Sequence, residues 1–423
     1  MLPAGDSRME WTLRLVEMGI DGQSRSFDVM AISRPDGLGD VANLGMTHVT
    51  QVIDRSYSKT QLGKAAGLRD VHAIICREAR RYKGRVLAVL QQEIEEALPG
   101  IGPLPGNVEL AHHNAVEGKD QWGPGPGRDG VEALIVVGRT APSPNEVEKM
   151  AEALTGVAIE RHQGWYPKAS AAREMADGTF RPAETDRHPN AVAEAIRWHI
   201  AEGQLVQIIG RARGVNRTES NPVDILVMTN APLPIPVEHL ISASDLDPSP
   251  ADLMMAAGGV SFESPTDAAT TYPNLWKSRQ AVADAWRRFK EGHTSSFRNR
   301  EYLIMETLRV QYQKAGARQR PSVACVDPAI VPDPQTWLTE RLGPLAYFSA
   351  TLEGFPTTPR TLPPARYRTL PSSAMLLPPA SDIDLTLIPT APSVASRRLG
   401  RKPLGEKTRP LVWPPGALSA PVP

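Results

Sequence analysis

The stretch that decides the fold is Glu132-Ala-Leu-Ile-Val-Val-Gly138, which is followed closely by Ser143-Pro-Asn-Glu146. The first run is apolar and has the length of a buried strand. In the second, the serine can cap a helix, the proline suits the first helical position, and the glutamate completes a capping box. We therefore expect a strand followed by a helix that runs to about Leu154 and ends at Gly156.

Strands alternate with helices on both sides of this unit. Upstream, Gly84-Arg-Val-Leu-Ala-Val-Leu-Gln91 is an apolar run followed by a short helical pattern, and Asn107 to Ala111 is a further strand candidate. Downstream, a long helix from Pro189 through Arg213 precedes the apolar run Asp224-Ile-Leu-Val-Met-Thr229. Alternation of this kind is typical of a parallel sheet with crossover connections. We predict an α/β layer domain over residues 84–232.

The chain before this domain carries weaker signals. Residues 1–83 form a poorly defined N-terminal segment, in which Glu10 to Met18 has the pattern of a short helix. Met46 to Ile53 alternates like a strand.

A second, smaller α+β unit is expected over residues 251–350. Ser278 to Glu291 has a helical pattern, and Tyr302 to Gln311 and Ser322 to Val326 have the patterns of two strands joined by a turn. A helix followed by a hairpin is the outline of a winged-helix-like module. Over residues 355–423 prolines recur every few positions, so we expect a disordered or polyproline-like tail.

The bulk composition limits the partners that the chain can have. Lys+Arg and Asp+Glu balance at 47 each, so a nucleic-acid surface would have to be a local patch. Cys76 and Cys325 lie far apart in the sequence and predict neither a disulfide framework nor a zinc site. A reducing, cytoplasmic setting is the simplest interpretation. No apolar run has membrane-spanning length, so we expect no membrane partner.

The most informative functional stretch is Gln207-Ile-Ile-Gly-Arg-Ala-Arg-Gly-Val-Asn-Arg217. It places a glutamine, a glycine and three arginines within about three helical turns. Arginines at this density suit a polyanion, such as a nucleoside triphosphate or a nucleic-acid backbone. The alternative is a basic, solvated helix end.

No complete phosphate cradle accompanies these arginines. In the closest match to a P-loop, Gly63-Lys64 is followed by Ala65 instead of Ser or Thr, and Ser58 stands in place of the first glycine. The glycine-rich Gly123-Pro-Gly-Pro-Gly127 has no lysine after it, and its prolines lack amide donors. No apolar strand ends in an Asp-Glu pair. We therefore expect that this chain does not hydrolyse ATP alone.

Three segments, in order, carry a family resemblance. Gln207 to Arg217 resembles motif VI of superfamily 2 helicases, whose arginines reach the γ-phosphate of ATP held by a neighbouring lobe. His112 to Asp120 ends in Gly-x-Asp and resembles motif V, and Val86 to Gln92 resembles the motif IV strand. Together they resemble the second RecA-like lobe of such a helicase.

The resemblance extends to primase–helicase proteins of bacterial plasmids and prophages. It rests on the Asn-Ala-x-x-Gly pattern at 114–118, on Leu134 to Arg139, and on the motif VI segment. Tyr272 to Trp276 and Asp333 to Leu338 are similar to their carboxy-terminal regions, so the likeness covers roughly residues 45 to 350. In such proteins a primase-type domain and the ATP-binding lobe come first, which predicts a truncated or split reading frame whose residues 1–83 are a remnant.

The resemblance assigns catalytic roles to the arginines. We expect Arg211 to be the arginine finger, with Arg213 or Arg217 as the second phosphate contact. Superfamily 2 motif VI usually reads Gln-x-x-Gly-Arg-x-x-Arg, whereas position 214 here is glycine. If the helix continues, Arg213 and Arg217 share a face at i, i+4 while Arg211 points elsewhere.

The resemblance also implies a nucleotide-binding set. Gln207 and Gly210 would link the nucleotide state to the lobe interface, and Gly118 and Asp120 would approach the ribose or a nucleic-acid phosphate. ATP and Mg²⁺ are expected only with a complementary ATP-binding lobe.

Further candidates for nucleic-acid contact lie outside these motifs. His113 and Asn114 suit nucleic-acid contact or simple turn polarity better than metal binding, because no suitably spaced cluster accompanies them, and no metal is predicted. Arg287, Arg288 and Lys290 are interleaved with aromatic residues on the 278–291 helix. The alternative is an amphipathic helix that buries its aromatic side chains.

The resemblance implies a DNA-binding motor component of a mobile element, supplying motif IV, V and VI residues of a helicase. One alternative is a non-enzymatic DNA-binding or regulatory protein whose helix–hairpin unit does the binding. Another is an inactive remnant.

Overall fold

A computed structural model describes residues 46–116, 118–292, 307–318 and 320–353, together with the backbone of two strands, β1 (Glu10–Met18) and β2 (Ser24–Ile32). These two strands pair antiparallel. The short helix predicted for Glu10 to Met18 is therefore wrong. Apolar residues recur at every second position from Trp11 to Leu15, which is the period of a strand.

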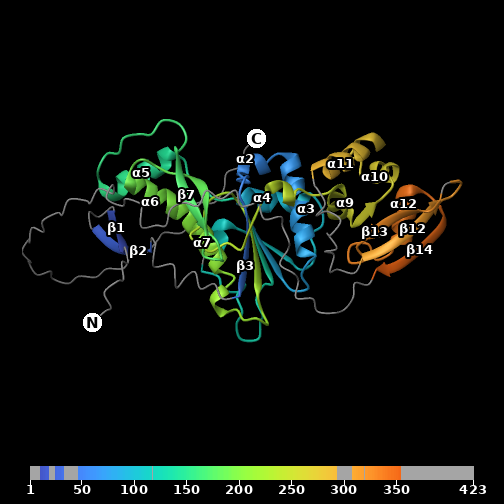
Figure 1. The fold of residues 1–423 in the computed structure, drawn as a ribbon, viewed down its shortest axis with the longest axis horizontal. Coiled ribbons are helices and arrows are strands. Elements are labelled where there is room, and N and C mark those ends of the chain that lie inside the picture. Colours follow the sequence, from blue (N-terminus) through green and yellow to red (C-terminus); the bar gives the residue numbers. More distant parts are fainter. Residues whose placement is uncertain are drawn as a thin grey trace, which may run out of the picture. The chain divides into compact units, whose positions relative to one another are not determined.

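The largest element is a six-stranded sheet in the order β10-β3-β9-β6-β4-β5, and all neighbouring strands pair in parallel (Figure 1). An α/β fold with a parallel sheet flanked by helices is thus confirmed. The strands are β3 (Thr47–Val52), β4 (Val86–Leu90), β5 (Val108–His112), β6 (Ala133–Val137), β9 (Val223–Met228) and β10 (His239–Ile241).

The sheet extends beyond the predicted 84–232 range at both ends. β3, in the segment 1–83, lies between β10 and β9, and β10 follows residue 232. Its alternating sequence predicts a strand, but only the tertiary structure shows that it pairs with β9 and β10 inside this sheet.

Helices cover both faces of the sheet. On one face, α3 (Ala65–Ala79) and α4 (Gln92–Ala97) pack against β4 side chains such as Ala88 and Leu90. On the other face, α7 (Gln204–Gly210) packs against a cluster that includes Leu87. Strands buried on both faces are apolar throughout, which explains why β4 and β6 were readable from the sequence.

The helix α5 (Pro144–Thr155) has the caps that its sequence predicts. The backbone N–H of Glu146 donates to Ser143 Oγ at 3.3 Å, and the Ser143 N–H donates to the Glu146 carboxylate at 2.7 Å. Gly156 ends the helix with φ of 69°, a left-handed conformation that glycine adopts without steric cost.

The long helix predicted from Pro189 to Arg213 is present with two changes. It comprises α6 (Ala191–Trp198), a π-helical turn (His199–Gly203) and α7. It ends at Gly210, and Arg213 adopts φ 52° and ψ 52°. The helix does not continue to Arg217, because the left-handed residue turns the chain away from the helix axis, so the condition under which Arg213 and Arg217 would share a face is not met.

An inserted hairpin and two short helices complete the α/β domain. Between α5 and α6, β7 (Lys168–Glu174) and β8 (Phe180–Asp186) form an antiparallel hairpin. The short helices α2 (Lys59–Leu62) and α8 (Ala243–Leu246) follow β3 and β10.

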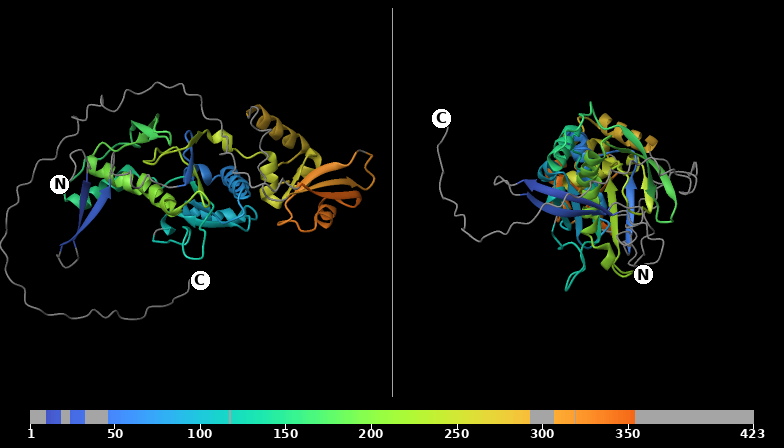
Figure 2. Two further views of the ribbon diagram at one scale, coloured as in Figure 1. Left: turned by 60° about the horizontal axis from the view of Figure 1, so that its bottom comes forward. Right: turned by 90° about the vertical axis from the view of Figure 1, so that its left-hand side faces the viewer.

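The carboxy-terminal unit is built on a four-stranded antiparallel sheet in the order β11-β13-β12-β14 (Figure 2). The predicted helix and hairpin are present as α11, β12 and β13; residues 302–306 of the first predicted strand and the tail 355–423 lie outside the described residues. The elements are α9 (Pro250–Gly258), β11 (Val260–Phe262), α10 (Pro265–Thr271), α11 (Arg279–Gly292), β12 (Thr307–Lys314), β13 (Ser322–Val326), α12 (Pro334–Leu342) and β14 (Leu345–Glu353).

This unit packs on the α/β domain through α9, which contacts α3. A buried ion pair joins Arg80 Nε, after α3, to Asp327 Oδ2, after β13, at 3.1 Å. Arg80 also donates to the carbonyl of Met255 on α9.

Candidate functional site

The structure brings together the predicted motif V and motif VI residues. Arg213 Nη2 forms an ion pair with Asp120 Oδ1, and Arg211 Nη1 lies 3.7 Å from the same oxygen. Arg213 and Asp120 are 93 positions apart in the sequence. We call Asp120, Arg211 and Arg213 the arginine cluster.

The arginine cluster depends on an unusual backbone turn. Arg213 is one of two non-glycine residues with positive φ among the described residues. This left-handed conformation costs roughly 1–2 kcal/mol for a residue with a Cβ. Its side chain lies against Gly123, where an added Cβ would overlap Arg213 Cβ and Cγ. A glycine in the 123–127 segment thus makes room for an arginine, and this segment was not recognised from the sequence as a support for the cluster.

The cluster lies at the amino ends of the parallel strands. Just after Asp120, the carbonyl of Gln121 accepts from Arg85 Nη1 at 3.2 Å, and Arg85 immediately precedes β4. The carbonyl of Trp122 accepts from the N–H of Val131, which precedes β6, at 2.8 Å. In Figure 1 the segment around residue 120 and the turn after α7 lie at the end of the sheet opposite α2 and α4.

Arg217 has its own set of partners away from Asp120. It is 6 % exposed, and its Nε and Nη2 each donate to the carbonyl of Ala212 at 3.0 Å. Its Nη1 donates to the carbonyl of Asp129 at 3.3 Å and to Asn221 Oδ1 at 2.9 Å. Burial lowers its pKa from the ordinary value. These bonds hold the turn that carries Arg213, so we assign Arg217 a positioning role in place of a phosphate contact.

The predicted nucleotide-binding residues on α7 are open to solvent. Gln207 and Gly210 are both exposed, and Gln207 lies one helical turn before Arg211. Gly118 has φ of 70°, which suits the turn that leads to Asp120. Gln207 therefore borders the arginine cluster, and Gly118 shapes its approach.

His113 and Asn114 lie at the opposite end of the strands, directly after β5. His113 is 3 % exposed, and burial lowers its pKa to about 4. The Asn114 side chain accepts a hydrogen bond from Gln204, whose Oε1 accepts from Thr140 Oγ1 at 2.7 Å. The buried imidazole belongs to the domain core, and these residues form no joint site with the arginine cluster.

The basic residues of α11 face solvent. Arg287, Arg288 and Lys290 are exposed, whereas Phe289 is 7 % exposed and Trp286 is partly buried in the core of the carboxy-terminal unit. Arg287 pairs with Asp284 at 2.9 Å. The helix is amphipathic, as the alternative interpretation expected, and its polar face keeps the basic side chains available.

The P-loop-like segment does not form a phosphate cradle. The N–H groups of Gln61 and Leu62 both donate to the carbonyl of Ser58 at 2.9 Å, and the Gly63 N–H donates to Lys59 at 2.8 Å. Because these amides are used inside α2, they are not directed at a ligand. The residues around Lys64 therefore do not fit the phosphates of a nucleoside triphosphate.

A buried ionic network ties the insertion to the long helix, and sequence reasoning did not find it. Arg139, after β6, contacts Asp186 of β8 at 2.6 Å and Glu202 of the π-helical turn at 3.1 Å. Arg197 contacts Glu202 at 3.0 Å. No local motif marks these residues, because the contacts join segments far apart in the chain.

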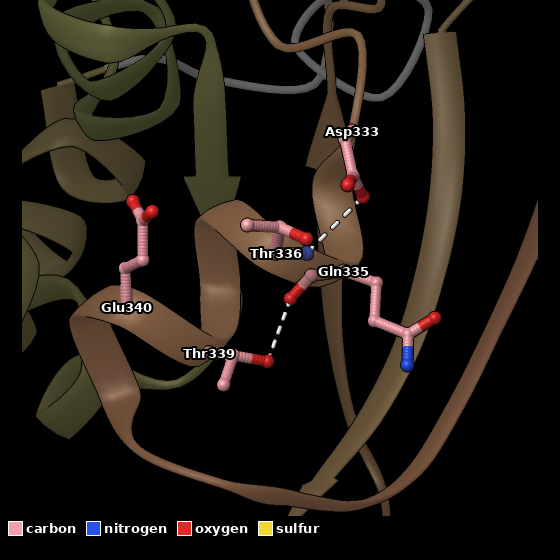
Figure 3. A pocket seen from close by; sticks show the side chains of 5 residues that line it. All are labelled: Asp333, Gln335, Thr336, Thr339 and Glu340. Carbon is pink, nitrogen blue, oxygen red and sulfur yellow. Dashed lines mark hydrogen bonds between the residues drawn. The ribbon is translucent and has the colours of Figure 1, made fainter.

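A shallow pocket lies along α12, away from all predicted site residues (Figure 3). Asp333 accepts from the Thr336 N–H at 3.1 Å as a helix cap, and Thr339 Oγ1 donates to the carbonyl of Gln335 at 2.7 Å. Its polar groups thus serve the helix itself. Glu340 completes the lining.

Comparisons with protein-family models, with curated proteins and with solved structures found no match. Among residues 46–353 that are described, no group of three metal-binding side chains was found. None of the helices in that part of the chain is long and apolar enough to span a bilayer.

Proposed function

We propose that this chain supplies the second RecA-like lobe of a superfamily 2 helicase from a mobile element, and that it acts on DNA. The α/β domain would present the arginine cluster to ATP and Mg²⁺ held by a complementary lobe. That lobe would belong to a longer version of the protein or to a separate chain, together with a primase-type domain. The carboxy-terminal unit, winged-helix-like in this proposal, would contact DNA.

The observation that carries the proposal is the meeting of Asp120 with Arg211 and Arg213. The motif resemblance assigns these residues to one nucleotide site, although they come from separate segments of the chain. Two guanidinium groups facing a single exposed carboxylate retain free donors for phosphate oxygens. An anionic ligand can replace Asp120 as the partner of both arginines at little cost, because the Asp120 carboxylate is already exposed to solvent.

The proposal assigns different tasks to the two arginines. Arg211 is the finger, because its side chain is 20 % exposed and its backbone caps the carboxyl end of α7. Arg213 is the second phosphate contact, held by Gly123 and by the turn that Arg217 supports. An arginine finger contributes roughly 10³–10⁵ in the rate of nucleotide hydrolysis.

The decisive experiment uses an ATP-binding lobe encoded next to this chain or fused to it. We expect DNA-stimulated ATP hydrolysis by the two-lobe protein, and Arg211→Ala should lower it by at least about 10³-fold. Arg187→Ala is a matched control, since Arg187 is an exposed arginine of the same domain outside the cluster. Unchanged hydrolysis in Arg211→Ala would refute the assignment.

DNA contact by α11 is tested by replacing Arg287, Arg288 and Lys290 with glutamine. Removing the whole unit after Ala251 is a poor test, because α9 and Asp327 pack against α3 and its end. If this unit is a non-enzymatic DNA-binding module, the triple variant loses all binding to single-stranded DNA. In the proposed helicase lobe, part of the binding persists through the residues around Gly118.

A further inference from the structure

A second basic site is indicated by Arg173, on β7 of the insertion. Its side chain is only 5 % exposed. Nη2 donates to the carbonyl of Asn230, and Nε has no hydrogen-bond partner. No ion pair between Arg173 and a carboxylate is found among the described residues, and burial lowers the pKa of the guanidinium to about 10. A buried cation without a counter-ion is costly.

The other buried arginines show how this cost is normally met. Arg80 faces Asp327, and Arg197 faces Glu194 and Glu202. Arg217 lacks an acid but places its donors on three different oxygen acceptors. Among the described residues, Arg173 has neither an acidic partner nor a set of several oxygen acceptors.

The position of Arg173 is one where parallel sheets bind ligands. Asn230 follows β9, at the carboxyl end of the strand. The adjacent loop is fixed by Gln51 of β3, whose Nε2 donates to the carbonyls of Thr229 at 3.0 Å and Ala231 at 2.6 Å. Arg173 therefore lies beside a hydrogen-bonded loop at the carboxyl end of the interior strand β9, where its guanidinium can be held in place for a ligand.

The connections after β3 and β9 leave the sheet on opposite faces. After β3, the chain enters α3, which packs in one core cluster. After β9, the chain passes through Leu233 and Ile235, which pack in the cluster on the other face. In open α/β sheets, ligands bind outside the carboxyl ends of neighbouring strands whose connections reverse in this way. This end of the sheet is opposite the arginine cluster.

We propose that Arg173, held beside the loop Thr229–Ala231, binds a phosphate group at a site distinct from the arginine cluster. The planar guanidinium group can donate two parallel hydrogen bonds to phosphate oxygens. The phosphate then supplies the negative charge that no carboxylate of the described residues supplies to Arg173. The phosphate belongs to a nucleic-acid backbone or to a free phosphate compound. Only the nucleic-acid source rests on the proposed function.

The first test measures thermal unfolding of the full chain in sodium phosphate and in sodium chloride at equal ionic strength. A ligand that binds only the folded state raises Tm as its concentration passes Kd. We expect the wild-type Tm to rise by several degrees in phosphate, with no rise in Arg173→Gln and a partial one in Arg173→Lys. Arg187→Gln, which removes an exposed arginine of the same insertion, should behave as wild type.

The second test measures binding of a fluorescent single-stranded oligonucleotide at several salt concentrations. If the phosphate belongs to nucleic acid, Arg173→Gln weakens binding by several-fold and lowers the salt dependence by about one phosphate contact. If only inorganic phosphate responds to the substitution, the source is a small phosphate compound.

The proposal is overturned if wild type and Arg173→Gln respond alike in both tests. The wild-type phosphate titration keeps it testable even if a variant folds poorly, since no rise in Tm and no oligonucleotide binding also overturn it. Failure of the helicase proposal looks different, because it would leave the phosphate-dependent Tm shift at Arg173 intact.

Discussion

The buried imidazole of His113 makes a sharp prediction about acid stability. The folded protein keeps the ring neutral down to about pH 4, whereas an exposed histidine in the unfolded chain takes up a proton near pH 6.5. Unfolding therefore binds a proton between these two values, and folded-state stability is lost as the pH falls through this window. Replacing His113 with glutamine removes this contribution.

The size of the effect follows from the two pKa values. Between pH 7 and pH 4.5, a shift from 6.5 to about 4 corresponds to a loss of about 2 kcal/mol in the free energy of unfolding. No large allowance for solvent is needed, because the side chain is 3 % exposed. We expect His113→Gln to be less stable than wild type at pH 7 and to lose about 2 kcal/mol less on acidification.

Urea unfolding followed by circular dichroism at pH 7, 6, 5 and 4.5 measures this difference. Other groups titrate in both proteins and cancel when the two curves are subtracted. His112→Gln is the matched control, since it replaces the adjacent imidazole, which is partly exposed and bonded to Glu95 at 2.7 Å. If the curves of wild type and His113→Gln stay parallel across this range, the reasoning about the buried ring is refuted.

Three further predictions concern single side chains. Burial is the main cause that raises the pKa of Asp70 to about 6, so the protein loses stability as the pH rises from about 4 through 6 and the buried carboxyl becomes charged. Asp70→Asn should raise the free energy of unfolding at pH 7 by roughly 1 kcal/mol after allowance for solvent screening, as measured by urea unfolding. Arg217→Ala should cost roughly 2–4 kcal/mol, because buried carbonyls lose their donors, and a cost below 0.5 kcal/mol (about the noise of such data) would contradict the positioning role. Gly123→Ala should cost about 1 kcal/mol by displacing Arg213, and this cost should vanish in an Arg213→Gly background, as a double-mutant cycle would show.

Local patterns predicted the parts of the fold that depend on neighbouring residues. The strands β4 and β6 are apolar over their whole length, and β9 is apolar apart from Asp224. The helix α5 carries its capping box and terminal glycine within a short segment. The helix predicted for Glu10 to Met18 was wrong because that interpretation ignored the two-residue alternation of apolar residues in this segment.

The sequence predicted only part of the candidate site. The arginine-rich segment after α7 is visible as a motif, but the positive φ of Arg213 has no sequence signal, because arginine rarely adopts it. Whether an arginine faces ligand, carbonyls or an acid depends on distant segments, and this separates Arg213 from Arg217.

The sequence by itself determined that the chain forms a parallel α/β sheet and that basic residues gather at the end of one helix. Strand burial and helix capping act over a few residues, so these features can be read locally. The tertiary structure decided the strand order, the meeting of Asp120 with Arg211 and Arg213, and the burial of Arg173 without an acid. Crossover connections bring those groups together across the sheet, and local sequence does not encode which partners they find there.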